Sequence, residues 1–492
     1  CGDREVVMSL GYQVKPDGTI LQEEMDEDGK KVWKPFSKLG VRRAILNDLS
    51  PAATFIAYNY NTPVDVAAFQ SQAKKILKEV KEECGWMYET LHTDGKTKGR
   101  INYVVWSDVF VCSECAEEFV FWDVAVKIGE GIVLDDFHCP NCNHWLSKSP
   151  ANPKTENSKP TSHRRPISSK VERAWETFFD DAIGETIKQA KKSPVLINYS
   201  VGKLRTEKTP DANDLRLIEK IETAPFSHWF PCDRMMAGKE TRRNDPIGLT
   251  HIHHFYTKRN LLILSALRAK VEESGIKALH YWLNSLDHGL GKRVKHGNYS
   301  FPMSTLSGTL YVPSLGRENN PLYFYATRFK KQSAVLAGSS AQGNPVSTQS
   351  SERLNVLDNS LDYIFVDPPF GSNLNYSELS FPWECWMKVR TDNVPEAIEN
   401  SVQGKGSAEY RHLMTDCFRE NYRMLKPGRW MTVEFSNTKA SVWNSIQTAL
   451  IDAGFIVANV SALDKQSGSF KAVNTPTAVK QDLVISAYKP NG

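Results

Sequence analysis

The chain has 492 residues, of which 40% are hydrophobic and 24% charged, and its formal net charge is +4. At about 150 residues per domain, this length predicts roughly three domains or one domain with large insertions, and the composition excludes a disordered chain. No apolar run approaches the ~18 residues of a membrane span and no secretory leader opens the sequence, so we expect a cytoplasmic protein with no membrane partner.

The first informative segment combines a strand, an acidic turn and a helix. The apolar run 41–46 predicts a strand, and Asp48 follows in the turn. Ser50 is a favourable N-cap and Pro51 a favourable first helical residue, so we expect a helix over 52–61. This order is typical of a domain in which strands and helices alternate.

Four of the nine cysteines form two C-x-x-C pairs, which 23 residues separate. The pairs are Cys112 with Cys115 and Cys139 with Cys142. Four thiolates at this spacing are typical of a zinc ribbon, in which a tetrahedral Zn ion has no open position for catalysis. We therefore expect a structural Zn ion in a small β insertion of a protein from a reducing compartment. The aromatic residues around the pairs are expected to form the core of this ribbon.

The middle of the chain is less regular in composition. Residues 148–170 are rich in Pro, Ser, Asn and basic residues, which predicts a linker, and 200–258 predict an irregular stretch. A helix is expected over 260–274, with Gly275 ending it.

Two kinds of side-chain cluster occur in this middle region. Basic pairs recur between positions 164 and 331. Together they predict a phosphate-binding surface, although any single pair is more often a solvated face. His251, His253 and His254 offer enough imidazole groups for a metal site, but we expect a packed, hydrogen-bonded loop instead.

The final part of the chain returns to an alternating pattern. Strands are expected over 361–366, 430–435, 455–460 and 483–487, and helices over 412–425 and 442–453. With the strand–turn–helix segment near the start, this pattern predicts an α/β protein with one doubly wound sheet, interrupted by a large mixed insertion that contains the ribbon.

The strongest functional signal is Asp367-Pro368-Pro369-Phe370, which directly follows the strand predicted over 361–366. Open α/β sheets bind ligands at the carboxyl ends of their strands. The prolines stiffen the turn and lack N–H donors, so carbonyl oxygens can face a ligand. The Asp367 carboxylate and the Pro368 carbonyl would present two acceptors, which match the two N–H donors of an exocyclic amine. Phe370 offers a face on which a base can stack.

This motif resembles a known family. Asp367-Pro368-Pro369-Phe370 is similar to the D-P-P-[FY] motif of the S-adenosylmethionine-dependent amino-methyltransferases of DNA. The longer run over 367–384, with Tyr376-Ser377-Glu378-Leu379 and Trp383-Glu384, resembles the large bacterial DNA methylases of the N4/N6 group. The resemblance implies a Rossmann-like methyltransferase sheet and S-adenosylmethionine as the cofactor.

The resemblance also implies cofactor contacts. Asp48 would hydrogen-bond the ribose hydroxyls of S-adenosylmethionine, Ser351 would lie near its adenine, and Asp367 would contact both the cofactor and the target base. A glycine-rich turn that holds the methionine end of the cofactor should precede Asp48, yet residues 1–40 contain none. Because the first residue is Cys1 rather than methionine, we expect a fragment that lacks this turn.

The reaction that the resemblance implies needs no covalent enzyme intermediate. A target base is rotated out of double-stranded DNA, and Asp367 and the Pro368 carbonyl accept hydrogen bonds from its amino group, which takes the methyl group directly. Aspartate at the first motif position favours adenine N6. Cytosine N4, an RNA amino-methyltransferase and a catalytically silent DNA-binding module stay open as alternatives. A restriction or defence-system partner and contact between the ribbon and DNA also stay open.

Domain boundaries follow from the same pattern. Residues 1–85 would form the first part of the methyltransferase domain and 86–150 the zinc-ribbon insertion. Residues 151–258 would form a linker and a DNA-recognition insertion, and 259–492 the second, catalytic part of the methyltransferase domain.

Overall fold

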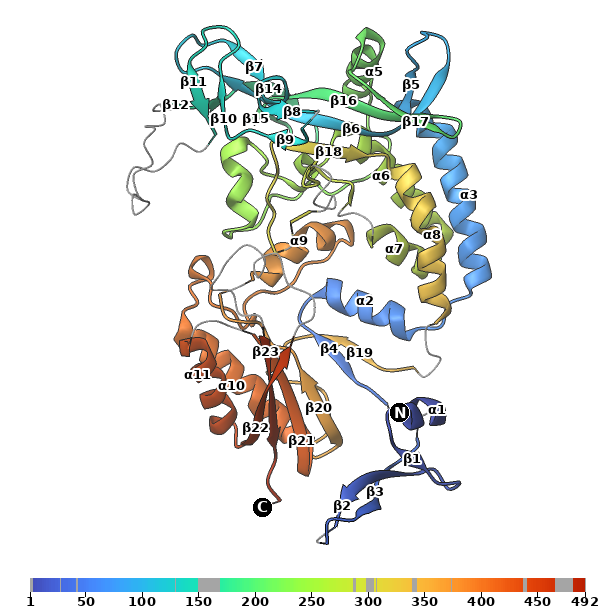
Figure 1. Cartoon of the computed structure of the whole chain (residues 1–492), viewed down its shortest axis with the longest axis vertical. Coiled ribbons are helices and arrows are strands. Elements are labelled where there is room, and N and C mark those ends of the chain that lie inside the picture. The colour runs from blue at the N-terminus through green and yellow to red at the C-terminus, as the bar shows by residue number, and fades with distance from the viewer. Residues whose placement is uncertain are drawn as a thin grey trace.

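The part of the chain with the Asp367 motif is a four-stranded sheet with helices on one face (Figure 1). In pairing order its strands are β20 (Leu361–Val366), β21 (Leu425–Phe435), β23 (Gln481–Tyr488) and β22 (Ile456–Asp464). β20 and β21 are parallel, and the other pairs are antiparallel. Alternate side chains of the strands form a core with helices α10 (Ser407–Met424) and α11 (Ala440–Asp452).

The fold is that of a computed structural model. It describes residues 3–26, 28–40, 43–128, 130–148, 169–285, 289–297, 305–306, 308–338, 343–372, 374–436, 440–464 and 481–491. Most of the linker predicted over 148–170 therefore lies outside the described residues. In the described part of the chain, no helix combines the length and the apolar character that crossing a membrane requires.

The opposite face of the four-stranded sheet is open. Tyr363 and Phe365 of β20 are 55% and 56% exposed, and Trp430, which pairs with Tyr363 on β21, is 46% exposed. Successive side chains of a strand point to opposite faces, so these residues lie across the sheet from Ile364, which is buried in the helix-covered core. A doubly wound sheet has helices on both faces; here the described helices cover one.

A second piece of parallel sheet carries Asp48. β4 (Leu46–Asp48) pairs with β19 (Val346–Thr348), and α2 (Pro51–Asn61) follows β4. Ser50 caps α2 and Pro51 occupies its first turn, as the sequence predicts. The α/β character is thus confirmed. Within the described ranges, however, no strand joins β4 to β20, so the expected doubly wound sheet occurs as two separate pieces.

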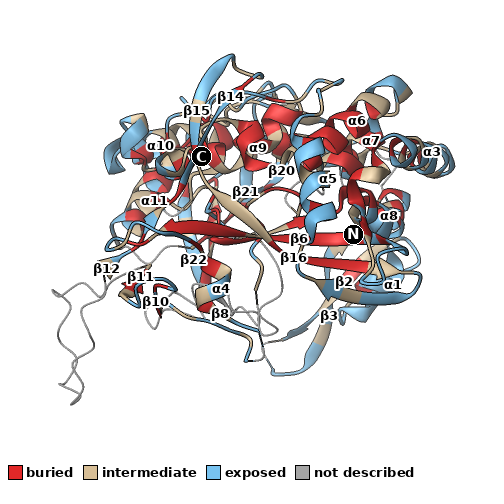
Figure 2. Ribbon diagram, turned by 90° about the horizontal axis from the view of Figure 1, so that it is seen from above, coloured by how far each residue is buried: buried red, intermediate tan, exposed pale blue. Residues whose placement is uncertain are grey.

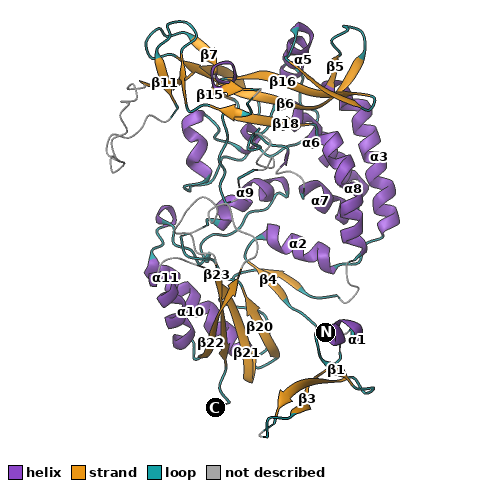
Figure 3. Cartoon of the chain, in the orientation of Figure 1, coloured by secondary structure: helices purple, strands orange, loops and turns teal. Residues whose placement is uncertain are grey.

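The middle of the chain forms the largest sheet, which has helices grouped on one side (Figure 3). Its strands are β6 (Lys98–Val111), β5 (Glu89–Leu91), β7 (Glu118–Val120), β13 (Glu172–Arg173), β16 (Lys192–Val201), β17 (Leu204–Lys208) and β18 (Leu315–Asn319). The helices are α3 (Val66–Cys84), α6 (Lys258–Ser274), α7 (Lys277–Asn284) and α8 (Pro321–Ala337). Their shared core includes residues from Phe69 to Trp386, on both sides of the predicted boundaries at 85 and 258, which stay predictions.

Helix α6 is the centre of this core, and Figure 2 shows it buried along most of its length. The Thr257 side chain accepts a hydrogen bond from the Asn260 backbone at the start of the helix. Gly275 ends it with a φ of 66°, a left-handed conformation that favours glycine. The helix expected over 260–274 is therefore confirmed and begins two residues earlier.

Two segments differ from the sequence expectations. The stretch 200–258 is not irregular throughout, because it contains β17 and helix α5 (Ala212–Glu222). Asp211 and Asp214 form a capping box at the start of α5, a local signal that stabilises this helix. The insertion around the cysteines, expected to be a small β unit, also contains a short helix, α4 (Phe121–Ala125), which begins directly after β7 ends at Val120.

The remaining elements are small. Around the cysteines lie β8 (Val126–Lys127), β9 (Ile132–Val133), β10 (Asp136–His138), β11 (Trp145–Ser147) and β12 (Ser169–Lys170). A two-stranded ribbon consists of β14 (Trp175–Asp180) and β15 (Glu185–Ala190). The N-terminal part contains α1 (Arg4–Ser9) and the sheet of β1 (Gln13–Val14), β2 (Thr19–Met25) and β3 (Lys31–Lys38). Helix α9 (Tyr376–Trp386) lies between the two larger parts in Figure 1.

Candidate active site and zinc centre

The carboxyl end of β20 presents the motif that the sequence singles out. The strand ends at Val366, and Asp367 follows with an exposed side chain. Pro368 is buried, and within the described residues its carbonyl accepts no hydrogen bond. The Tyr410 hydroxyl donates to the next carbonyl, that of Pro369, over 2.8 Å. Two acceptors on consecutive residues thus lie at a strand end that a neighbouring helix supports.

Aromatic side chains fix the turn after these acceptors. The Phe370 ring meets the Phe435 ring edge-on, with centroids 5.4 Å apart and an interplanar angle of 86°. Burial, with a smaller contribution from the Asp367 carboxylate, raises the pKa of Tyr376 to about 12, while the Phe370 backbone opposes the shift. The Tyr376 hydroxyl therefore stays protonated at neutral pH and lies close enough to Asp367 to interact with it electrostatically.

Asp48 and Ser351 lie together at the carboxyl ends of β4 and β19. The Asn47 side-chain amide donates to Ser351 Oγ over 3.1 Å and to the Gln349 carbonyl over 3.1 Å. Asp48 Oδ1 accepts from the Ser50 backbone N–H over 2.8 Å. Burial raises the pKa of Asp48, and the Ser50 N–H opposes that shift. The structure thus brings together two residues that are 303 positions apart in the sequence.

Glu384 of α9 connects the two strand ends. Its carboxylate is 1% exposed and accepts from Ser50 Oγ over 2.7 Å, from the Thr391 backbone N–H over 2.7 Å and from Thr391 Oγ1 over 2.6 Å. Ser50 follows Asp48 by two residues, and Glu384 also raises the pKa of Asp48. The helix that follows Asp367 is therefore anchored next to the turn that carries Asp48.

Glu378 connects α9 to the middle of the chain. Its fully buried carboxylate accepts from the backbone N–H groups of Glu240 and Thr241 over 2.7 and 3.1 Å, and from the Asn400 amide over 3.0 Å. The chain passes so close that a Cβ atom on Gly238 would lie 2.1 Å from the Glu378 carboxyl carbon. No local pattern signals the contacts of Glu378, Glu384 or Gly238, because their partners are distant in sequence.

The four predicted metal ligands converge. Cys112 Sγ lies 3.6 Å from Cys142 Sγ, Cys115 Sγ lies 3.7 Å from Cys139 Sγ, and all four sulfurs are within 4.8 Å of one another. A tetrahedral site with Zn–S bonds of ~2.3 Å has sulfurs about 3.8 Å apart. The donor set therefore fits one Zn ion with four thiolate ligands and no open position.

The backbone around the two pairs repeats the same turn. The N–H of Ala116 donates to the Cys112 carbonyl, and the N–H of Asn143 donates to the Cys139 carbonyl, each over 3.0 Å. Ala116 and Asn143 have left-handed φ angles of 58° and 60°. The cluster packs on a core of four phenylalanines, as expected: Phe110, Phe119, Phe121 and Phe137.

We expect the purified protein to contain one Zn ion per chain, measured by inductively coupled plasma mass spectrometry. Cys139→Ser should lose most of the metal and lower the melting temperature, because three thiolates hold Zn more weakly and a small β unit depends on its metal. The matched control is Cys232→Ser, since Cys232 is an exposed cysteine outside the cluster. Equal zinc contents in the two variants would contradict the assignment.

The histidine cluster is a hydrogen-bonded loop. His253 Nε2 and His254 Nε2 each lie 2.8 Å from Asp180 Oδ2. His254 Nδ1 accepts from the backbone N–H groups of Thr250 and His251 over 3.1 and 3.3 Å, so the neutral ring carries its proton on Nε2. A protonated Nε2 cannot ligate a metal. Although the three side chains are close enough for an ion, this tautomer supports the loop that the sequence predicts.

These buried imidazoles predict a pH-dependent stability. Burial and then the neighbouring His253 lower the pKa of His254 to about 3, well below the ~6.5 of an unfolded histidine. Its contribution is fully present above pH ~6.5 and is lost as the pH falls toward 3. We expect the free energy of unfolding to fall by up to about 1.4 kcal/mol per pH unit in this window because of His254. Urea unfolding at pH 7, 6, 5 and 4 measures it, and His254→Gln should flatten the profile; an unchanged slope would refute the assignment.

Many of the basic pairs are already neutralised. Lys191 contacts Glu118 over 2.6 Å, Lys192 contacts Asp108 over 2.7 Å, and Arg243 contacts Glu240 over 2.8 Å. Arg293 is buried, and the pair at 164–165 lies outside the described residues. The phosphate-binding surface stays a prediction, with fewer available cations than the sequence suggests.

No protein-family model matches this sequence, and no curated protein matches it. Three solved structures with similarity are a candidate DNA modification methylase from Thermus thermophilus, an S-adenosylmethionine-dependent methyltransferase from Methanosarcina mazei and the [4+2]-cyclase SpnF. Their identities are 15%, 12% and 13%, with TM-scores of 0.17, 0.18 and 0.18. The matches cover 28%, 33% and 34% of this chain and 48%, 77% and 61% of those chains, so about half of the Thermus protein is spanned. TM-scores this far below 0.5 do not establish a shared fold.

Proposed function

We propose that this protein is a site-specific DNA methyltransferase that transfers a methyl group from S-adenosylmethionine to an exocyclic amino group. The amino group that we propose as the target is adenine N6. One observation carries the proposal. The consecutive acceptors of Asp367 and Pro368 lie at the carboxyl end of a parallel strand, and Glu384 anchors the following helix beside the turn that carries Asp48. Strand ends of this kind are where α/β sheets bind ligands.

The cofactor would be held at the ends of β4 and β19. Asp48 reaches solvent, although the surrounding protein partly desolvates its carboxylate, and this carboxylate suits the two hydroxyls of a ribose. Ser351 lies beside Asp48, linked to it through the Asn47 side chain. S-adenosylmethionine would supply a methyl group already activated on a sulfonium. The residues of this chain would bind both reactants, orient them and exclude water from the site.

The target amino group would be held by the turn after β20. The Asp367 carboxylate and the Pro368 carbonyl would accept hydrogen bonds from its two N–H groups. The lone pair of the nitrogen would then be directed away from these two acceptors. The negative charge of Asp367 also stabilises the positive charge that develops on nitrogen. Phe370, held edge-on against Phe435, is positioned to support the base.

The alternatives differ in what they need. A methyltransferase that acts on cytosine N4 or on an RNA amino group would use the same two acceptors, the Asp367 carboxylate and the Pro368 carbonyl. A silent DNA-binding module would keep the turn after β20 but would not bind S-adenosylmethionine. We further propose that the Zn ion is structural and that the middle of the chain recognises double-stranded DNA, with a restriction or defence-system partner.

The test is nucleoside analysis of the reaction products. The full-length protein is incubated with S-adenosylmethionine and either double-stranded DNA or RNA, and the digested nucleic acid is examined by mass spectrometry. N6-methyldeoxyadenosine supports the proposal, and N4-methyldeoxycytidine or a methylated ribonucleoside supports the corresponding alternative. Absence of every methylated nucleoside, in a protein that binds DNA, identifies the silent module instead.

A further inference from the structure

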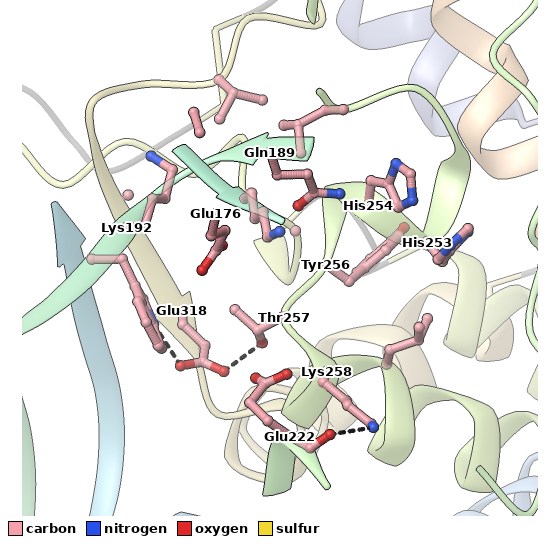
Figure 4. A pocket seen from close by; sticks show the side chains of 18 of the residues that line it. Glu176, Gln189, Lys192, Glu222, His253, His254, Tyr256, Thr257, Lys258 and Glu318 are labelled. Carbon is pink, nitrogen blue, oxygen red and sulfur yellow. Dashed lines mark hydrogen bonds between the residues drawn. The ribbon is translucent and has the colours of Figure 1, made fainter. Parts of the chain in front are cut away.

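A cavity of about 610 Å³ lies in the middle of the chain, apart from the Asp367 turn (Figure 4). It is enclosed by the ribbon β14–β15, by β16 and β18, and by the loop and helix start at Tyr256–Lys258. None of Asp48, Ser351 and Asp367 lines it. The volume is in the range that holds a small organic ligand.

Several charged groups on the cavity wall are satisfied by other protein groups. Asp108 pairs with Arg173 and Lys192. Glu318 accepts from the Trp106 indole N–H and from the Thr257 hydroxyl, and Figure 4 shows the Glu318–Thr257 contact. The Asp108 and Glu318 carboxylates therefore form part of the wall, and their hydrogen-bonding capacity is largely used by protein groups.

Four other polar side chains of the wall are different. Gln189 is only 6% exposed, it lies on the cavity wall, and its amide makes no hydrogen bond among the residues that the structure describes. Lys292, which is half-buried, and Glu176 and Glu222, which are exposed, also line the cavity, and in the described ranges no side-chain hydrogen bond or ion pair within 4.0 Å joins them to another residue. Because the Gln189 amide faces the cavity, a ligand or water there can satisfy its hydrogen-bonding capacity.

The electrostatics of these groups are coupled across the cavity. Burial, with a smaller contribution from Lys192, lowers the pKa of Lys292 to about 8, whereas Glu222 and Glu176 oppose the shift. Partial desolvation by the surrounding protein raises the pKa of Glu176 and of Glu222, although both residues reach solvent, and Lys292 opposes both shifts. One cation and two carboxylates therefore face the same space without forming a direct pair.

This arrangement excludes two simple ligands. On this wall, the described residues close enough to hold a metal ion are Asp180, His253 and His254. Both Nε2 atoms contact the Asp180 carboxylate, and His254 carries its proton on Nε2, so this cluster is already satisfied internally. Glu176, Glu222 and Glu318 form no metal-ligating cluster among the described residues. An inorganic anion would meet two unpaired carboxylates and a single unpaired ammonium group. A suitable ligand must therefore offer both donors and acceptors.

The aromatic part of the wall adds a shape requirement. Phe178 and Phe179 of β14 are 41% and 59% exposed and line the cavity, with Phe226 and Tyr256 as further aromatic lining. Exposed rings beside a polar wall suit a flat heterocycle, because stacking is favourable with any π-face.

We propose that this cavity binds a purine base, in a free nucleoside or in a nucleic acid. The Gln189 amide offers a donor and an acceptor side by side, the pair that matches a purine edge. Lys292 would donate to a ring nitrogen or carbonyl oxygen, Glu222 or Glu176 would accept from an amino group, and one of the β14 rings would stack on the base. The proposal does not require methyl transfer, so it can fail or succeed independently of the proposed function.

The test measures binding without S-adenosylmethionine. Isothermal titration calorimetry of the full chain uses adenosine, guanosine, cytidine and uridine. A second arm uses single-stranded oligonucleotides that carry one purine or an abasic site at the same position. Gln189→Leu and Lys292→Met remove the polar groups, and the matched control is Lys78→Met, because Lys78 is exposed and lies outside both the cavity and the range of the basic pairs. Melting temperatures within a few degrees of the parent show which variants fold, and either cavity variant suffices.

We expect purine ligands to bind at least tenfold more tightly than pyrimidine ligands, and each cavity variant to weaken purine binding at least tenfold. Binding of free purine nucleosides identifies a free ligand. Binding of purine oligonucleotides alone, lost with the abasic site, identifies a base within a nucleic acid. The proposal is overturned if no purine binds in either arm, if pyrimidines bind equally well, or if the folded variants bind as tightly as the control.

Discussion

Replacing Asp367 by asparagine is expected to reduce methyl transfer by about 10²–10³-fold, the cost typical of removing one preorganised electrostatic contact from an active site. Asparagine has nearly the same size, but it lacks the negative charge that stabilises a positive charge developing on the target nitrogen. Its amide can also direct N–H donors at an amino group that is itself a donor. The measurement is the initial rate of methyl incorporation into DNA at saturating S-adenosylmethionine.

The matched control is Asp362→Asn in the same strand. Asp362 is exposed and pairs with Lys426 over 2.8 Å, away from the carboxyl end of β20. This variant should retain nearly the parental rate and melting temperature, because an exposed ion pair contributes little stability. Equal rates for the two variants would remove Asp367 from the reaction.

The largest expected effect on stability comes from Gly238→Ala. The new Cβ would lie 2.1 Å from the carboxyl carbon of Glu378 and 2.3 Å from both of its oxygens. This carboxylate is fully buried and is held by backbone N–H groups of Glu240 and Thr241, so it cannot move away without leaving those donors unpaired. We expect a loss of at least about 3 kcal/mol in the free energy of unfolding, measured by urea denaturation.

Gly338→Ala is the control for this variant. Gly338 follows α8, its φ is −85°, and an added Cβ would meet its nearest atoms at an ordinary 3.6 and 3.8 Å. Its free energy of unfolding should change by less than about 1 kcal/mol. If Gly238→Ala is as stable as Gly338→Ala, α9 does not depend on the close approach seen here.

Several features could be predicted because they depend on neighbouring residues. Ser50 and Pro51 start a helix through local capping, and strand β20 ends at the predicted residue because a proline pair follows Asp367. Local patterns failed where the next element depends on packing. Residues 121–125 have a strand-like composition, yet they form α4 against the core of the ribbon.

The pairing of distant residues depended on the whole fold. Asp180 contacts the imidazoles of two histidines that lie more than 70 positions away in the sequence. The tautomer of His254 is set by backbone N–H groups that no sequence motif identifies. The cavity around Gln189 is likewise formed by strands and loops from separate parts of the chain.

The sequence by itself determined which four cysteines cluster, that two acceptors follow strand β20 and where the helix after Asp48 begins. Each of these depends on spacing within a short segment, where covalent geometry and hydrogen-bonding rules act directly. Only the tertiary structure decided that Glu378 and Glu384 anchor α9 on two sides, and that the parallel strands occur in two pieces. Contacts of this kind join residues more than 100 positions apart, and they are set by how buried faces pack together rather than by any local pattern.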